Sequence, residues 1–129
     1  MGIDTVVPAS GKTAYDRFHY SQAVKSGGLL VCSGQIGTDP DHSVPESAEA
    51  EFRNAWDAVG LVLKEAGLGF EDIIEYTSFH VNFNAHIRAF MKIRDEVLSA
   101  PWPAWTAIGI TELAIPGARA EIRVIAQLR

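Results

Sequence analysis

Residues 73–83 read IIEYTSFHVNF, and their character alternates from one position to the next. Successive side chains of a strand point to opposite faces of a sheet. The odd positions carry mostly apolar residues, and the even positions carry polar ones: Thr77, Phe79, Val81 and Phe83 against Tyr76, Ser78, His80 and Asn82. We therefore predict a strand with one apolar face toward the core and one polar face away from it.

An amphipathic helix is expected on each side of this strand. The first starts near Pro45, which suits a first turn, and stops before Gly67. The second is capped by Asn84 and runs to about Ser99. Arg94 falls on the apolar stripe of the second helix, where two interpretations stay open. It is either a snorkelling side chain at the edge of the stripe, or an arginine that holds an anion at an interface or pocket.

Further strands are predicted at residues 5–7, 21–25, 29–33, 105–111 and 119–128, and residues 1–27 otherwise look irregular. Strand–helix–strand crossovers of this length are right-handed, so both helices pack on one face of the sheet. The fold class is therefore α+β with a mixed sheet. The uncovered face is expected to be half polar, which favours association between copies of the chain. It carries Tyr76, His80, Arg119, Glu121 and Arg123.

Composition narrows the class of protein. The chain has 129 residues, 47% apolar and 21% charged, which predicts one globular domain over 1–129. Sixteen acidic residues against 11 basic ones, a net charge of −5, argue against a nucleic-acid partner. No stretch has the character of a signal peptide or a membrane span, so we expect a cytoplasmic protein without membrane contact. The lone Cys32 is expected to be a buried hydrophobic residue.

The common motifs of catalysis and cofactor binding are missing. The four histidines have no metal-ligand spacing, and no phosphate-binding glycine loop precedes a helix, so we expect neither metal nor cofactor. Ser33 lacks the flanking glycines of a nucleophile elbow. Glu121 lies between Arg119 and Arg123, which should keep the pKa of its carboxyl low. Taken alone, these residues indicate only an α+β domain that oligomerises.

Six short motifs, in order along nearly the whole chain, add a resemblance. They are YSQAV at 20–24, LVCSGQI at 30–36, AGL at 66–68, DII at 72–74, PA at 103–104 and AEIRVIA at 120–126. With them the chain resembles the RidA (YjgF-type) reactive-intermediate deaminase family. The resemblance implies a chorismate-mutase-like fold and a homotrimer around a central barrel, with small-molecule clefts between subunits. It also implies hydrolysis of imines and enamines, such as 2-aminoacrylate, to 2-keto acids and ammonia.

The resemblance also implies a set of site residues. The catalytic positions fall on Glu121 and Ser33, and the substrate-binding positions fall on Tyr20, Gly34 and Gln35. The family arginine that follows Pro-Ala and grips the substrate carboxylate is here Trp105, and the tyrosine position of the second helix holds Arg94. Tryptophan cannot form the charge-assisted pair that a guanidinium forms with a carboxylate. Arg94 or Arg119 is the candidate for a replacement anion contact.

Two function classes follow from this departure. In the first, the cleft is rebuilt for another small, partly apolar imine-like substrate, and Trp105 shapes its specificity. In the second, catalysis is lost and the trimer is a small-molecule-binding or protective protein. Trp105 either lines the cleft or fills it by packing across the trimer interface. A Trp105 ring that occupies the space between Ser33 and Glu121 would favour the second class.

Overall fold

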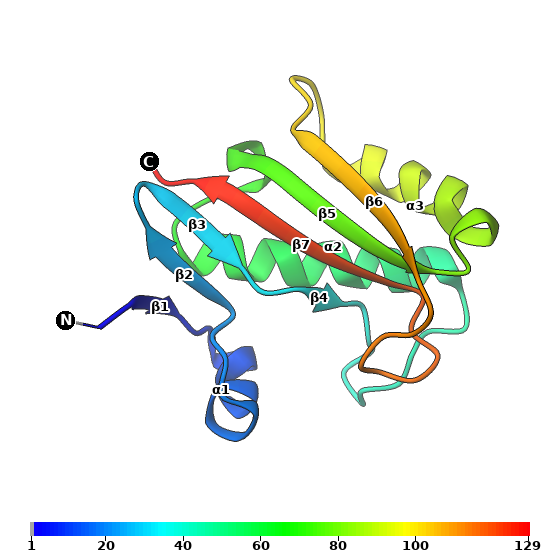
Figure 1. The fold of residues 1–129 in the computed structure, drawn as a ribbon, viewed down its shortest axis with the longest axis horizontal. Coiled ribbons are helices and arrows are strands. Elements are labelled where there is room, and N and C mark those ends of the chain that lie inside the picture. Colours follow the sequence, from blue (N-terminus) through cyan, green and yellow to red (C-terminus); the bar gives the residue numbers. More distant parts are fainter. Residues whose placement is uncertain (1) are drawn as a thin grey trace.

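The computed structural model describes residues 2–129 and contains a seven-stranded mixed sheet (Figure 1). Its strands are β1 Asp4–Val6, β2 Ala23–Ser26, β3 Leu29–Cys32, β4 Gln35–Ile36, β5 Ile73–Val81, β6 Ala104–Ile110 and β7 Ala120–Gln127. They are ordered β1-β2-β3-β7-β5-β6, and β4 also pairs with β7. The β5–β6 pair is parallel, and the other pairs are antiparallel. The predicted α+β class with a mixed sheet is confirmed.

Two long helices, α2 Ala48–Glu65 and α3 Phe83–Val97, cover one face of the sheet, as predicted (Figure 1). The core between helices and sheet is aromatic: Trp56 of α2 packs edge-on against Tyr76 of β5, with ring centroids 5.4 Å apart. Both predicted helix starts were wrong. Ser47 caps α2 by accepting a hydrogen bond from the Ala50 amide at 3.2 Å, and Asn82 rather than Asn84 occupies the N-cap of α3.

The orientation predicted for β5 was also wrong. Tyr76, Ser78 and His80 face the helices and are at most 2% exposed, whereas Phe79 lies on the uncovered face and is half-buried. The reason is that the polar atoms find partners inside the core. Ser78 Oγ contacts His80 Nε2 at 2.7 Å, so these two polar side chains share a hydrogen bond beneath the helices.

Three short helical segments were not predicted from the sequence. A short helix, α1 Lys12–Phe18, follows the 3₁₀ turn Ala9–Gly11, and a second 3₁₀ turn spans Phe70–Asp72. None of the α1 residues is buried, so the helix has no apolar stripe from which it could be recognised. Within residues 2–129, no helix has both the length and the hydrophobicity needed to span a bilayer.

Candidate functional site

A cavity of about 670 Å³ lies where β4, α1 and α2 meet, and four of the predicted site residues line it. These four are Tyr20, Gly34, Gln35 and Glu121. The remaining lining residues come from α1, α2 and the loops around β2, β4 and β7. They are Pro8, Ser10, Gly11, Ala14, Phe18, Gln22, Ile36, Thr38, Asn54, Ala58, Leu61, Val62, Ala114 and Ile115.

Strand pairing places Glu121 beside the glycine of the second motif. Ile36 of β4 is the register partner of Glu121 on β7, so the chain segment before β4 crosses the glutamate side chain. A Cβ built on Gly34 would overlap the Glu121 carboxylate. Residue 34 must therefore be a glycine if the carboxylate is to keep this position.

The carboxylate of Glu121 has an unusual environment. In the described part of the chain, neither a hydrogen bond nor an ion pair reaches it, and burial raises its pKa above the ordinary value of 4.5. The predicted low pKa was therefore wrong. The side chain of Arg119 is bound elsewhere, and Arg123 is exposed. Desolvation without a partner favours the protonated form, so this carboxyl can give or take a proton nearer neutral pH than a solvated one.

Hydrogen bonds fix the backbone that forms the polar side of the cavity. Ser33 Oγ donates to the carbonyl of Ser21 at 2.7 Å, and Gln35 Nε2 donates to Gln22 Oε1 at 2.7 Å. Ser33 does not line the cavity, and its hydroxyl proton is already engaged, which is a poor arrangement for a nucleophile. Cys32 is buried, as predicted, and burial raises the pKa of its thiol to about 12.

The side chain of Arg119 is held by hydrogen bonds to α2 and to the segment before it. Its Nη1 donates to Glu51 Oε1 at 2.7 Å and to the Pro45 carbonyl at 2.9 Å, and its Nη2 donates to the Glu46 carbonyl at 2.7 Å. Glu51 is fully buried and also accepts from the backbone amides of Arg119 and Ala120. The sequence analysis missed this pair, because a glutamate in the first turn of a helix is usually a solvated charge.

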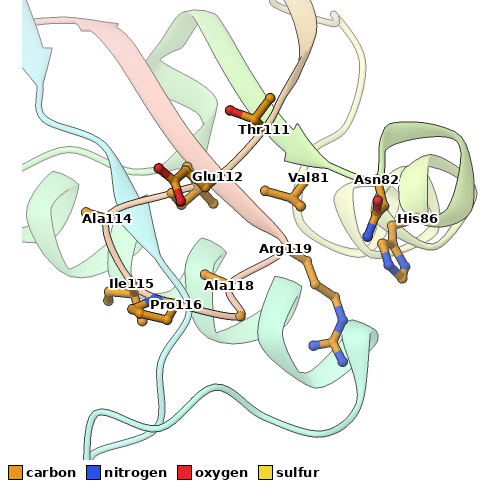
Figure 2. Close-up of a pocket in the computed structure, with 12 residues that line it drawn as sticks. Val81, Asn82, His86, Thr111, Glu112, Ala114, Ile115, Pro116, Ala118 and Arg119 are labelled. Atoms are coloured by element: carbon orange, nitrogen blue, oxygen red, sulfur yellow. The ribbon is translucent and has the colours of Figure 1, made fainter.

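Arg119 also borders a second cavity of about 670 Å³ between the 111–118 loop and the start of α3. Figure 2 shows its guanidinium extending toward α2, with Asn82 and His86 on the α3 side and Glu112 on the loop. The two cavities share Ala114 and Ile115, but Glu121 borders only the first.

Trp105 and Arg94 lie on the helix-covered side, away from Glu121. Trp105 is the register partner of Tyr76 and stacks on its ring at 5.7 Å, while its Nε1 donates to Ser78 Oγ at 2.9 Å. The Arg94 Cζ lies 4.9 Å from the Trp105 ring centroid, and its Nη1 donates to the Tyr76 hydroxyl at 2.9 Å. Glu121 is paired with Phe79, whose side chain lies on the opposite sheet face from that of Tyr76. Within one chain, the Trp105 ring therefore does not fill the space between Ser33 and Glu121.

Among residues 2–129, no three histidine, cysteine, aspartate or glutamate side chains gather closely enough to hold an ion. The cavity contributes a single carboxylate, Glu121, and the uncharged polar groups around it.

Comparison with known proteins extends over nearly the whole chain. The profile of the family described as Endoribonuclease L-PSP matches residues 10–128. The RutC family protein YjgH of Escherichia coli K12 is 40% identical over 95% of this chain and 93% of its own length. The 2-iminobutanoate/2-iminopropanoate deaminase of Dermatophagoides farinae is 32% identical over 82% of this chain and 83% of its own.

Solved structures are also similar to this chain over nearly its whole length. A structure of protein YJGH has a TM-score of 0.89 and 36% identity, and covers 99% of this chain and 98% of its own. RidA from an Antarctic Psychrobacter species has a TM-score of 0.79 and 26% identity, and covers 99% of both chains.

Proposed function

Because the chain belongs to the Endoribonuclease L-PSP family, in which RidA and the 2-iminobutanoate/2-iminopropanoate deaminases are found, we propose that it hydrolyses a small, partly apolar imine or enamine. The observation that carries this proposal is the Glu121 carboxylate. It borders the cavity and has no hydrogen-bond or ion-pair partner among residues 2–129, its pKa is raised by burial, and Tyr20, Gly34 and Gln35 border the same space.

The proposed reaction uses Glu121 as a general base and then as an acid. An enamine first takes a proton on carbon to become the imine. Water then adds to the C=N carbon while the Glu121 carboxylate takes one of its protons. The protonated Glu121 returns this proton to nitrogen, which gives a neutral carbinolamine. Glu121 then takes the hydroxyl proton of the carbinolamine and passes it to nitrogen, so that the C–N bond breaks, ammonia leaves and a carbonyl compound remains. One water is consumed for each ammonia released.

The other polar groups of the site would hold and orient the ligand. The Tyr20 hydroxyl lies at the rim, since its side chain is 43% exposed. Gln35 keeps its Oε1 as an acceptor because only its Nε2 is used by Gln22. Ser33 does not border the cavity; its Oγ donates to the Ser21 carbonyl and so holds the backbone that precedes Gly34.

We propose a homotrimer in which Trp105 and Arg94 of one copy reach the cavity of the next. Within one chain these two side chains and Glu121 lie on opposite faces of the sheet, so they can meet around one ligand only across a subunit boundary. The uncovered face supports association, because it exposes apolar side chains such as Val31 at 37% and Ile108 at 40%. Arg119, bound to Glu51, would then contribute to stability rather than to ligand contact.

The test is ammonia release from freshly generated 2-iminopropionate and from an aromatic imino acid. We expect Glu121→Gln to lower kcat/KM by about 100-fold or more, the usual loss when a general base is removed. Glu65→Gln, an exposed glutamate at the end of α2, is the matched control and should be unchanged. Equal turnover by wild type and Glu121→Gln would remove the proposed role, and absence of turnover would favour a non-catalytic binding protein.

Trp105→Arg tests the substrate grip in the same assay. An arginine here gives the neighbouring cavity a cation, so we expect kcat/KM for 2-iminopropionate to rise by about 10-fold, a typical value for one charged hydrogen bond. If the variant folds and its kcat/KM does not rise, residue 105 does not contact the substrate.

A further inference from the structure

The cavity beside Glu121 has two chemically different parts. Its polar groups come from the segment around β4, from Glu121 of β7, and from Ser10, Tyr20, Gln22 and Asn54. Its apolar wall comes mainly from α1, through Ala14 and Phe18, and from α2, through Ala58, Leu61 and Val62. A ligand that fills both parts needs a polar reacting group at one end and an apolar group at the other.

Two large side chains of the apolar wall are exposed. Phe18 is 73% exposed and Leu61 is 54% exposed, and both border the cavity. Apolar surface of this size gains stability when it is removed from water, so the wall favours an apolar ligand that covers it. Ala14 and Ala58 contribute small side chains to the same wall.

The size and the charge of the cavity also favour a ligand with a large apolar group. Pockets of roughly 300–1,000 Å³ hold drug-sized molecules, and this cavity measures about 670 Å³, far more than a three-carbon imino acid requires. The described residues that line it include no lysine or arginine, and the one charged group is the Glu121 carboxyl. The walls that a single chain supplies therefore recognise a ligand by apolar contact, and in the proposed trimer the cation for a carboxylate would be Arg94 of the neighbouring copy.

We propose that the preferred substrate is an imine or enamine with a bulky apolar substituent, aromatic or branched, that packs against Phe18, Ala58 and Leu61. This inference rests on the proposed function, since it names the substrate class of the same site. In such a complex the C=N carbon lies toward Glu121 and the substituent toward the two helices.

The experiment compares kcat/KM for 2-imino-3-phenylpropionate and for 2-iminopropionate. Both substrates carry the same carboxylate, so the ratio of their kcat/KM values reports the contribution of the substituent alone. We expect wild type to favour the aromatic substrate by about 10-fold or more, since apolar pockets discriminate by about 10–200-fold for each methylene. Ala58→Phe should remove most of this preference, because the added ring occupies the space of the substituent. Ala85→Phe, on the exposed side of α3, is the control and should leave the ratio unchanged.

A binding measurement separates this inference from the proposed reaction. Phenylpyruvate and pyruvate, the keto products of the two substrates, are titrated calorimetrically into wild type and Ala58→Phe. Tighter binding of phenylpyruvate that is lost in Ala58→Phe supports the ligand class, even if no ammonia is released and the hydrolysis proposal fails. Equal or absent binding of both products, or an equal loss of both activities in Ala58→Phe, overturns it.

A second copy of the chain could instead cover the apolar wall. Leu61→Ser, followed by size-exclusion chromatography, tests that occupant. A change of oligomeric state together with an unchanged substrate ratio overturns the ligand proposal. An unchanged oligomer with a reduced aromatic preference supports it.

Discussion

Glu51 on α2 and Glu121 on β7 are two carboxylates in opposite surroundings. Glu51 is fully buried and accepts hydrogen bonds from the Arg119 guanidinium and from two backbone amides. Glu121 faces a cavity, receives no hydrogen bond from residues 2–129, and has a raised pKa. The difference teaches that burial alone does not mark a functional acid. A fully paired carboxylate holds the fold together, whereas a desolvated and unpaired one is available for proton transfer.

The largest effect on stability should come from breaking the paired carboxylate. Glu51→Gln leaves the part-buried Arg119 cation without its partner, and such losses typically cost about 3–5 kcal/mol. Glu121→Gln has no bond to lose and replaces a desolvated acid with a neutral amide, so its free energy of unfolding should not fall. Urea unfolding at neutral pH measures both. An equal loss in the two variants would contradict the contrast.

The next largest effect on stability is expected from His80, a buried base on the helix-covered side of the sheet. The pKa of His80 is lowered by burial from 6.5 to about 4. Between these values the unfolded chain binds a proton that the folded chain does not, so stability falls as pH drops from 6.5 to 4. The full loss is roughly 3 kcal/mol at 1.36 kcal/mol per pKa unit. We expect His80→Leu to flatten this pH dependence and His86→Ala to reduce it only slightly, because the His86 charge is the smaller cause of the lowered pKa, as followed by urea unfolding from pH 4 to 7. If the free energy of unfolding of His80→Leu still falls between pH 6.5 and 4, the proton is taken up by another group.

The hydrogen-bond network explains which atom of His80 is left without a partner. Ser78 Oγ accepts from Trp105 Nε1 and also shares a hydrogen bond with His80 Nε2, so Nε2 has a partner in either tautomer of the neutral ring. Nδ1 has no partner in the described part of the chain. Protonating the ring would therefore bury a charge and leave an N–H group without an acceptor.

The sequence was sufficient to predict the fold class, both long helices and the main strands, because these have clear periodic patterns. It failed on the face of β5. Ser78 and His80 look solvated in the sequence, yet they are paired with each other beneath the helices, and hydropathy cannot register a hydrogen bond. It also missed α1, which buries no residue.

The candidate site was partly predictable for a similar reason. Motif positions indicated that Tyr20, Gly34, Gln35 and Glu121 belong together, and all four line one cavity. The sequence could not show that Arg119 is bound by Glu51, because the two lie 68 residues apart in the chain. That error also gave the wrong direction for the pKa of Glu121, since the expected cationic neighbour points elsewhere.

A smaller effect is expected at the aromatic cluster of β6. Trp105→Phe keeps a ring against Tyr76 but removes the N–H that donates to Ser78 Oγ. We expect a loss of about 1 kcal/mol, the usual net value of one hydrogen bond. Chemical unfolding of Trp105→Phe, of Ser78→Ala and of the double variant measures the coupling. If the two losses simply add, the hydrogen bond does not contribute.

The smallest effect on stability is expected from the exposed ion pairs between α2 and α3. Arg53 lies 3.0 Å from Glu96, and both side chains are almost half exposed. Solvent and salt screen such pairs, so Arg53→Met should cost less than Trp105→Phe, and the loss should vanish at high salt. A loss as large as that of Glu51→Gln would contradict the distinction between buried and exposed pairs.

The most direct test of the central claim is the pH dependence of kcat/KM for ammonia release, corrected for uncatalysed hydrolysis. If Glu121 is the general base, the rate of the wild type falls at low pH with an apparent pKa above the ordinary glutamate value of 4.5, and this limb is absent from the residual activity of Glu121→Gln. The same acidic limb at the same pKa in Glu121→Gln would contradict the account, because the titrating group would then lie elsewhere.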